Sequence, residues 1–305
     1  MDWYILGQQL VNGVTLGAIY GLIAIGYTMV YGIIGMINFA HGEIYMISAY
    51  ITAIAFAVFT FLGIDSLALS LLLTLMVTMF ITGLYGWYIE RTVYRPLRTT
   101  NRLAPLITAI GVSLLLQNYV QVSQGPYVQG VPSVIQGGFT VGSDGGFFQI
   151  RYIDLLIVVV SFIAMMILTW VIQKTSLGRQ CRAVEQDRKM ATILGINTTR
   201  IISTVFVIGS VMAAVAGELV TFNYGSFDFH IGFILGIKAF SAAVLGGIGS
   251  LPGAMLGGLI LGVLESLFAG FVSSDYKDVF SFSVLVLVLI FKPSGLLGRP
   301  AVEKV

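Results

Sequence analysis

Three polar side chains of different chemistry interrupt an apolar run in the stretch GMINFAHGEIYMISAY, residues 35–50. Asn38 supplies an amide, His41 an imidazole and Glu43 a carboxylate. Asparagine is a favourable N-cap for a helix that begins near His41, and the helix dipole stabilises a carboxylate in the first turn. Helix capping therefore explains Asn38 and Glu43, but so does a pathway that needs weak polar groups. For His41, a hydrogen bond at the helix terminus and a proton relay are both open.

Lys238 lies in the middle of another apolar run, residues 231–247. Its ammonium is too far from either end of the run to reach the membrane surface easily. We expect Lys238 to pair with a carboxylate, Glu218 or Glu265, or to line a path. The ionisable residues form no catalytic constellation, and the chain has one cysteine and no His/Cys cluster with metal-ligand spacing. The sequence thus predicts no catalytic residue, no metal site and no cofactor.

The elements that must position these residues are membrane helices. Hydrophobic residues make up 57% of the 305 residues, charged residues make up 10%, and the mean hydropathy is +0.94. Such a composition lies far outside the soluble average. We expect an all-α polytopic membrane protein with about eight or nine helices, each crossing roughly 30 Å of hydrocarbon, in one transmembrane domain over residues 1–305. The expected spans are residues 12–34, 43–62, 67–89, 104–122, 153–173, 201–222, 231–247, 254–272 and 279–297.

Basic residues are concentrated in a few of the connections between these spans. Residues 91–102 contain four, residues 174–200 six and residues 292–304 three, so 13 of the 16 fall in three segments. Cytoplasmic loops are enriched in Lys and Arg, so these segments and the C-terminus are predicted to face the cytoplasm. The polar stretch 123–152 is predicted to be an external loop. Counting the spans then places the N-terminus outside.

Glycine occurs in two different patterns. The first is a four-residue step along one helical face, which predicts close helix packing. The residues in this pattern are Gly13, Gly17 and Gly21, Gly253 with Gly257, and Gly258 with Gly262. The second pattern breaks apolar runs, at residues 35–43 and 244–262, once in each half of the chain. Paired breaks are typical of transport sites built on broken or re-entrant helices, because unwound backbone offers N–H and C=O groups to a substrate; ordinary turns are the alternative.

The basic segment 174–200 is predicted to be a cytoplasmic loop that contains a short amphipathic helix or helix pair between residues 179 and 194. Glu185 and Lys189 are spaced i,i+4, and Gly195 would end the helix. The expected apolar stripe is Cys181, Val184, Ala191 and Leu194. Such a helix needs a partner surface, either the membrane or a soluble protein.

Four stretches are similar to a known family: YGIIGMINFAHGEIYMISAY, GRQCRAVEQDRKMATILGIN, KAFSAAVLGGIGSLPGAMLGGLILGVLE and KPSGLLGRPAVEKV. They resemble the LivH-like permease subunits of bacterial ATP-binding-cassette (ABC) importers for branched-chain amino acids, over residues 10–305. The resemblance implies import of leucine, isoleucine and valine across the inner membrane. The implied partners are a second related permease, two cytoplasmic ATPases and a periplasmic binding protein, with no nucleic acid. An ABC permease for urea or short amides and an ion-coupled secondary transporter are the alternatives.

The resemblance also implies roles for particular residues. The substrate pathway would contain Asn38, Phe39, His41, Gly42, Glu43, Gly246, Gly247, Gly249 and Ser250. The contact with the ATPase would contain Gly178, Arg179, Arg182, Ala183, Glu185, Asp187, Ala191, Leu194 and Gly195. Gln186 and Lys189 make this loop less acidic than is common in the family. The chain contains no G-x-x-x-x-G-K-[ST] motif, so ATP hydrolysis is expected on the partner subunits and this chain is not expected to be an enzyme.

Overall fold

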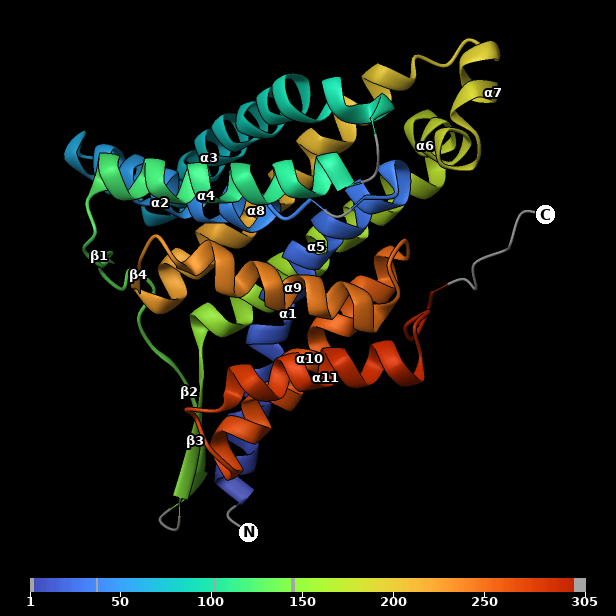
Figure 1. Ribbon diagram of the computed structural model, residues 1–305. Helices are drawn as coiled ribbons and strands as arrows, with labels where there is room; N and C mark the ends of the chain where they lie inside the picture. Colours follow the sequence, from blue (N-terminus) through green and yellow to red (C-terminus); the bar gives the residue numbers. More distant parts are fainter. Residues whose placement is uncertain (1–2, 37, 101–102, 144–145, 299–305) are drawn as a thin grey trace.

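The computed structural model describes residues 3–36, 38–100, 103–143 and 146–298, and it has the all-α architecture expected of a polytopic membrane protein (Figure 1). The α-helices are α1 (Trp3–Ile34), α2 (His41–Phe61), α3 (Leu67–Ile89), α4 (Leu103–Gln124), α5 (Tyr152–Lys174), α6 (Ser176–Gln186), α7 (Arg188–Ile193), α8 (Thr198–Tyr224), α9 (Ile231–Gly246), α10 (Leu251–Phe271) and α11 (Lys277–Phe291). A π-helical turn, Glu90–Tyr94, extends α3, and a 3-10 turn, Pro96–Thr99, follows it. Seven of the described helices are long and apolar enough to cross a membrane: α1, α2, α3 with its extension, α4, α5, α8 and α10.

The observed helices match the expected spans closely, with two differences at the ends of the chain. Helix α1 begins at Trp3 instead of near residue 12. Helix α11 ends at Phe291 instead of near residue 297, because Pro293 disfavours helical backbone in the residue before it. Both glycine-containing breaks lie between helices: residues 35–40 join α1 to α2, and residues 247–250 join α9 to α10.

Four short strands lie in segments where the sequence indicated only loops. Strands β2 (Gly138–Ser143) and β3 (Gly146–Arg151) form an antiparallel hairpin in which Phe139 lies opposite Ile150. Strand β1 (Gln129–Gly130) pairs with β4 (Ser226–Phe227). In Figure 1 the hairpin projects beyond the helices, beside the start of α1.

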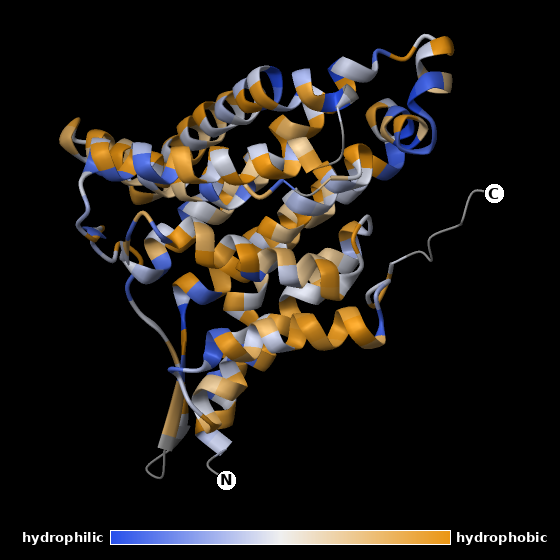
Figure 2. Ribbon diagram, viewed as in Figure 1, coloured by the Kyte–Doolittle hydropathy of each residue, from blue (hydrophilic) through white to orange (hydrophobic). Residues whose placement is uncertain are grey.

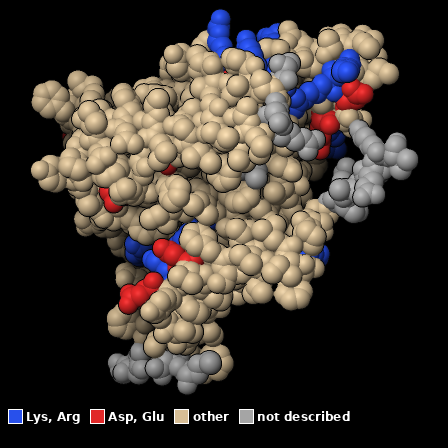
Figure 3. All heavy atoms as spheres, in the orientation of Figure 1, with Lys and Arg blue, Asp and Glu red and all other residues tan. Residues whose placement is uncertain are grey.

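Polar contacts between connecting segments and helix ends show which of them lie at the same end of the helical bundle. At one end the Gln149 backbone N–H donates to the Gln8 side chain, and the Val131 N–H donates to the Gly225 carbonyl. At the other end Arg98 donates to Thr199. The segments 91–100 and 174–200, which hold most of the basic residues, thus share one end, and the predicted external stretch lies at the opposite end with the start of α1. In Figure 3 many of the visible Lys and Arg side chains lie at the upper right, in the region of α6 and α7 in Figure 1.

The outward faces of the long helices are apolar. Phe80 of α3 is 69% exposed, Ile107 of α4 is 66% exposed and Trp170 of α5 is 63% exposed. Figure 2 shows mostly hydrophobic residues along the long helices, whereas hydrophilic residues gather on α6, on α7 and at helix ends. Large apolar side chains on the outside of a helix bundle are expected where the surroundings are lipid.

Helices α1 and α10 pack backbone to backbone through the periodic glycines. A Cβ added at Gly17 would lie 2.7 Å from the Cα of Leu259, and one added at Gly258 would lie 2.6 Å from the Cα of Gly21. Side chains larger than hydrogen therefore do not fit at this crossing without a shift of the backbone. The predicted packing role of the small residues is confirmed: Gly13, Gly17, Gly21, Gly258 and Gly262 pack at this crossing, whereas Gly253 and Gly257 pack against Gly246 at the end of α9.

Candidate functional site

The start of α2 is buried inside the protein, and Asn38 ties it to the end of α3. The Asn38 Oδ1 accepts hydrogen bonds from the Tyr94 hydroxyl at 2.5 Å and from the Ala40 backbone N–H at 3.1 Å. Helix α2 begins at His41 as predicted, but Ala40 is its N-cap, and the Ala40 side chain makes no capping bond. The prediction of Asn38 as the N-cap is therefore wrong. Its amide closes the turn before the helix, as Asn side chains commonly do two residues ahead of a backbone N–H.

His41 fills a space between helices instead of facing an open channel. It is 1% exposed, and its imidazole lies edge-on to Tyr27, with ring centroids 4.8 Å apart. The ring occupies the space that Gly26 of α1 leaves free, since a Cβ there would overlap the imidazole. Within the described residues its Nε2 has no hydrogen-bond partner. The imidazole is therefore enclosed between helices in this structure.

Glu43 lies in the first turn of α2, as predicted, and is also 1% exposed. Its Oε1 accepts a hydrogen bond from the Ser113 hydroxyl of α4 at 3.1 Å, while Oε2 has no hydrogen-bond partner among the described residues. A buried carboxyl group with a single donor is costly. Ionisable residues in membrane spans are usually functional, so Glu43 stays a candidate for the transport pathway.

Glycine allows α2 to cross α9 at close range beside Glu43. A Cβ added at Gly42 would overlap the Gly232 carbonyl and lie 2.9 Å from the Cα of Gly236. Gly232 and Gly236 are one helical turn apart on α9, so the two backbones touch along a short stripe. The structure therefore gives Gly42 a packing role at this crossing.

The second break, between α9 and α10, is a tight turn. Gly247 and Gly249 have φ values of +103° and +97°, a region that glycine adopts without strain. Ser250 is the N-cap of α10, and its hydroxyl accepts a hydrogen bond from the Gly253 N–H at 3.2 Å. The chain after α11 covers this turn, because the Leu297 N–H donates to the Gly246 carbonyl at 2.9 Å.

Aromatic side chains connect the first break to α9. Phe240 of α9 lies 6.0 Å from the Phe39 ring and 6.2 Å from the Tyr27 ring, measured between centroids. Tyr27, Phe240 and Ile248 of the second break line one small cavity of about 10 Å³. This is about the space that one water needs.

Lys238 takes part in a buried charge cluster that joins three helices. Its Nζ lies 2.7 Å from Glu265 Oε1 of α10 and 2.5 Å from Asp278 Oδ1 of α11. The Glu265 carboxylate also accepts hydrogen bonds from the Tyr20 and Ser281 hydroxyls. The predicted pairing with Glu265 is confirmed, and the alternative partner Glu218 is not used. Tyr20 and Asp278 were not predicted, because only the fold brings them to Lys238.

The basic segment forms a helix pair, which is one of the two predicted alternatives. Helix α6 ends at Gln186, and Asp187 is the N-cap of α7, where its side chain accepts hydrogen bonds from the Lys189 and Met190 N–H groups. Glu185 and Lys189, spaced i,i+4 in the sequence, therefore lie on separate helices. Gly195 has a φ of +82° just after α7, as expected of a glycine that ends a helix.

The expected apolar stripe of this segment is only partly buried. Cys181, Val184 and Ala191 are buried, whereas Leu194 is 77% exposed. Leu194 is thus not part of the buried stripe; it is the C-cap of α7, just beyond the last helical residue. Burial raises the pKa of the Cys181 thiol to about 11.

Two residues assigned to the ATPase contact hold α6 against the end of α5. A Cβ added at Gly178 would overlap the Ile172 carbonyl, and the Arg182 Nη1 donates to the same carbonyl at 2.7 Å. Arg179 Nη1 approaches the Lys174 carbonyl at 3.5 Å. These contacts satisfy carbonyl groups at the end of α5, and they fix the direction of α6.

Comparison with known proteins assigns the chain to a family. The profile of the family described as "Branched-chain amino acid transport system / permease component" matches residues 9–289. This chain belongs to that permease family. It is 54% identical to the high-affinity branched-chain amino acid transport system permease protein BraD of Pseudomonas aeruginosa, over 98% of this chain and 97% of the relative. It is 53% identical to the permease protein LivH of Escherichia coli K12 over the same shares of both chains.

A more distant relative is also named as a permease protein of branched-chain amino acid transport. The permease is 27% identical to the high-affinity branched-chain amino acid transport system permease protein LivM of Salmonella typhimurium, over 96% of this chain and 71% of the relative.

The permease also contains a polar network at its basic end that sequence reasoning missed. The buried Glu90 carboxylate pairs with Arg98 and with Arg95, the latter at 3.3 Å. Ser203 of α8 donates to Glu90 at 2.5 Å and accepts from Arg95. Glu90 itself could have indicated this network in the sequence. It is a single carboxylate at the end of an apolar run, and several arginines follow it closely.

Proposed function

We propose that this chain is a permease subunit of an ATP-driven importer that moves leucine, isoleucine and valine into the cytoplasm. The observation that carries the proposal is 53–54% identity, over nearly the full length of both chains, to LivH and BraD. Their names state the high-affinity transport of branched-chain amino acids. The whole chain, residues 1–305, would form one transmembrane domain in the inner membrane.

The proposed assembly contains a second permease, two cytoplasmic ATPases and a periplasmic binding protein. The similarity to LivM supports a second, related permease as the partner. Two chains with similar sequences have similar folds, so they can pair with approximate two-fold symmetry. The sequence lacks a P-loop motif, so the energy of ATP would reach it from separate subunits.

We place the ATPase contact at α6 and α7. Three large apolar side chains of the α7 region are exposed: Met190 is 58%, Ile193 is 78% and Leu194 is 77% exposed. They follow a short amphipathic helix at the end of the bundle that holds most of the basic residues. Exposed apolar side chains rimmed by charged ones suit a protein partner. This end, with the C-terminus, would face the cytoplasm.

We place the substrate pathway along the two breaks. Asn38, His41 and Glu43 are buried polar side chains on one side of it, and the turn 246–250 lies on the other. Helices α2 and α9 are in close contact at the Gly42 crossing, and the proposed pathway would open where they separate. The aromatic ring of Phe39 would then face the apolar tail of the substrate.

Reconstituted vesicles test this function. The two permeases, the ATPases and the binding protein are placed in liposomes, and uptake of labelled leucine is measured with ATP and with a non-hydrolysable analogue. We expect uptake only with ATP, competition by isoleucine and valine, and no competition by urea or acetamide. Uptake that persists without ATP and is abolished by a proton ionophore would favour an ion-coupled secondary transporter. Competition by urea instead of valine would favour the amide permease.

A further inference from the structure

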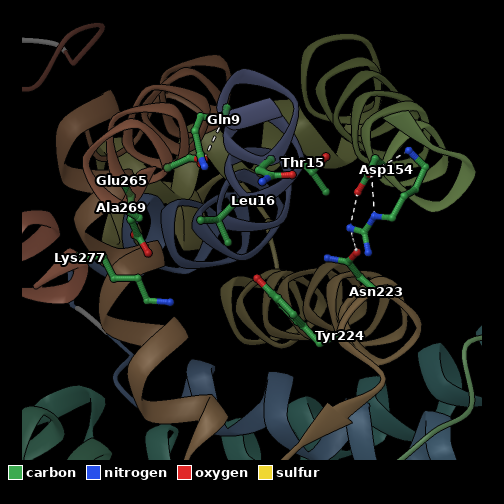
Figure 4. A pocket seen from close by; sticks show the side chains of 12 residues that line it. Gln9, Thr15, Leu16, Asp154, Asn223, Tyr224, Glu265, Ala269 and Lys277 are labelled. Carbon is green, nitrogen blue, oxygen red and sulfur yellow. Dashed lines mark hydrogen bonds and ion pairs between the residues drawn. The ribbon is translucent and has the colours of Figure 1, made fainter. Parts of the chain in front are cut away.

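A polar cavity of about 440 Å³ opens at the end of the bundle opposite α6 and α7, away from both breaks. Its walls come from five helices: the first turns of α1, the start of α5, the ends of α8 and α10, and the start of α11 (Figure 4). Sites for small molecules typically have volumes of about 300–1,000 Å³. The lining residues that carry the argument are Arg151, Asp154, Asn223, Tyr224, Glu265 and Lys277.

The charged groups of the cavity balance each other. Arg151 forms an ion pair with Asp154 at 2.7 Å and donates to Asn223 at 2.8 Å, so both side chains are held in place. Glu265 is 2% exposed and is fixed by the buried charge cluster behind the wall. The Lys277 backbone carbonyl accepts a hydrogen bond from the Ser281 hydroxyl at 3.0 Å, whereas the Lys277 ammonium makes no hydrogen bond or ion pair within the described part of the chain. The cavity therefore presents fixed negative and positive groups together with one ammonium that is free to bind.

The free ammonium faces the cavity. Figure 4 shows the Lys277 side chain and the Tyr224 hydroxyl pointing into the space from opposite sides, with Leu16 and Ala269 on the wall between them. A carboxylate placed here would meet a cation and a hydroxyl donor, which are the strong partners of an anion. An ammonium would meet the carboxyl side of the cavity, and the apolar wall would receive a hydrocarbon side chain.

We propose that this outer cavity binds the zwitterionic head of a free amino acid, with Lys277 on its carboxylate. The inference rests on the proposed function, because it names the first site on the permease that a released substrate would meet. A phosphatidylethanolamine head group shares the combination of an ammonium and an anionic group. The apolar wall and the fixed, balanced charges favour a free amino acid with a branched side chain.

Protection from a thiol reagent localises the ligand. In the paired permeases in phosphatidylcholine nanodiscs, with Cys181→Ala as background, Ala269→Cys places a thiol in the cavity and Val141→Cys places one on the exposed hairpin. The rate of labelling by a charged, impermeant methanethiosulfonate is measured with L-leucine, leucinamide, 4-methylpentanoate or glycerophosphoethanolamine. We expect leucine to slow labelling at residue 269, the two half-charged analogues to protect less, and residue 141 to be unaffected.

Two lysine variants separate binding from a structural effect. Lys277→Gln should weaken protection by leucine about tenfold, as expected for one charge-assisted hydrogen bond. Lys292→Gln, at the opposite end of α11, is the matched control and should leave protection unchanged. Absence of protection, or equal protection by glycerophosphoethanolamine, overturns the proposal. If leucine uptake by the full transporter still depends on ATP in that case, the transport function stands and only the outer site is wrong.

Discussion

Arg188 of α7 is bound to the last carbonyl groups of α1. Its Nη2 donates to the Ile34 oxygen at 2.8 Å and to the Ile33 oxygen at 3.0 Å. The final carbonyls of a helix lack partners within the helix, and a cation there also interacts favourably with the helix dipole. The segment proposed to contact the ATPase is thus hydrogen-bonded to the end of α1, directly before the connection that contains Asn38.

Loss of the hydrogen bonds between Arg188 and α1 should reduce transport while ATP hydrolysis continues. For Arg188→Gln we expect leucine uptake to fall about tenfold or more, because hydrogen bonds of a charged donor contribute about 1.5–3 kcal/mol. ATP hydrolysis by the reconstituted complex should continue, since the exposed face of α7 is unchanged. Lys292→Gln, at an exposed lysine after α11 and outside α6 and α7, is the control and should transport normally. Normal uptake by Arg188→Gln would show that the contact does not transmit movement.

The hydrogen bond between Tyr94 and Asn38 can be measured by a double-mutant cycle. Asn38→Ala leaves the buried Tyr94 hydroxyl without its acceptor, and an unsatisfied buried polar group costs about 1–3 kcal/mol. Tyr94→Phe in the same chain removes that group, so the double variant should lose less stability than the two single variants added together. The free energy of unfolding and leucine uptake are both measured in nanodiscs. Strict additivity would mean that the two side chains do not interact.

Uptake by milder variants tests whether Asn38 is on the pathway. Asn38→Ser keeps a small polar group but shortens it, and we expect reduced leucine uptake at normal membrane levels. His41→Gln keeps a hydrogen-bond donor and should be milder. Normal transport by Asn38→Ser together with loss of transport in His41→Gln would contradict the neutral pathway and favour proton coupling.

Two glycines of α1 provide a matched test of helix packing. Gly17→Ala forces a methyl group against the backbone of α10, and overpacking of this kind costs about 1–3 kcal/mol. Gly32→Ala is the control, because a Cβ at Gly32 meets nothing within 4 Å and alanine favours the helix. Thermal unfolding in detergent should show a lower midpoint for the first variant and an equal or higher one for the second. Equal midpoints would mean that α1 and α10 are less tightly packed than the structure shows.

Cysteine labelling in whole cells tests the orientation in the membrane. In a Cys181→Ala background, Val141→Cys on the hairpin should react with an impermeant thiol reagent added outside. Thr100→Cys, exposed at the basic end, should react only after the membrane is opened. The reverse pattern would invert the assignment of the two ends.

The buried thiol of Cys181 should respond to pH in a defined direction. Its pKa is raised to about 11, and the thiolate is the reactive form. Maleimide labelling of the folded protein should therefore be slow at pH 7 and rise about tenfold per pH unit up to pH 10. Burial of the neutral thiol stabilises the fold below the ordinary thiol pKa of about 8.5, and this contribution is lost as the pH rises towards 11. Equally fast labelling of folded and unfolded protein at pH 7 would contradict the burial.

The sequence predicted helix positions well because spans are encoded by long apolar runs, whose length alone carries the information. The errors occur where tertiary packing decides. Asparagine is a residue type that favours N-cap positions, which led to the prediction for Asn38. Its hydrogen bond to Tyr94 could not be predicted locally, because Tyr94 lies 56 positions away along the chain. Leu194 has the spacing of the buried stripe, yet it lies just beyond the end of α7 and is exposed.

The sequence predicted that certain long-range polar contacts must exist, but it did not identify all of the residues that make them. A lysine in the middle of an apolar run must have a buried carboxylate nearby, and this argument identified Glu265 as one of two partners. It did not identify Asp278, which lies at the start of α11 and reaches Lys238 only when α9 and α11 pack together. The outer cavity likewise draws its residues from five helices, and no local pattern in the sequence brings those helices to one place.

The close packing of α1 and α10 at their glycines can form only late in synthesis of the chain. Gly17 enters the membrane early, but its partners near Gly258 are synthesised roughly 240 residues later, some tens of seconds at about 5–20 residues per second. During that interval the groove along α1 has no protein surface to close it, and lipid or the insertion machinery must cover it. A slower ribosome, or a truncated chain that stops before α10, would leave the first helix exposed to premature association and to membrane proteases.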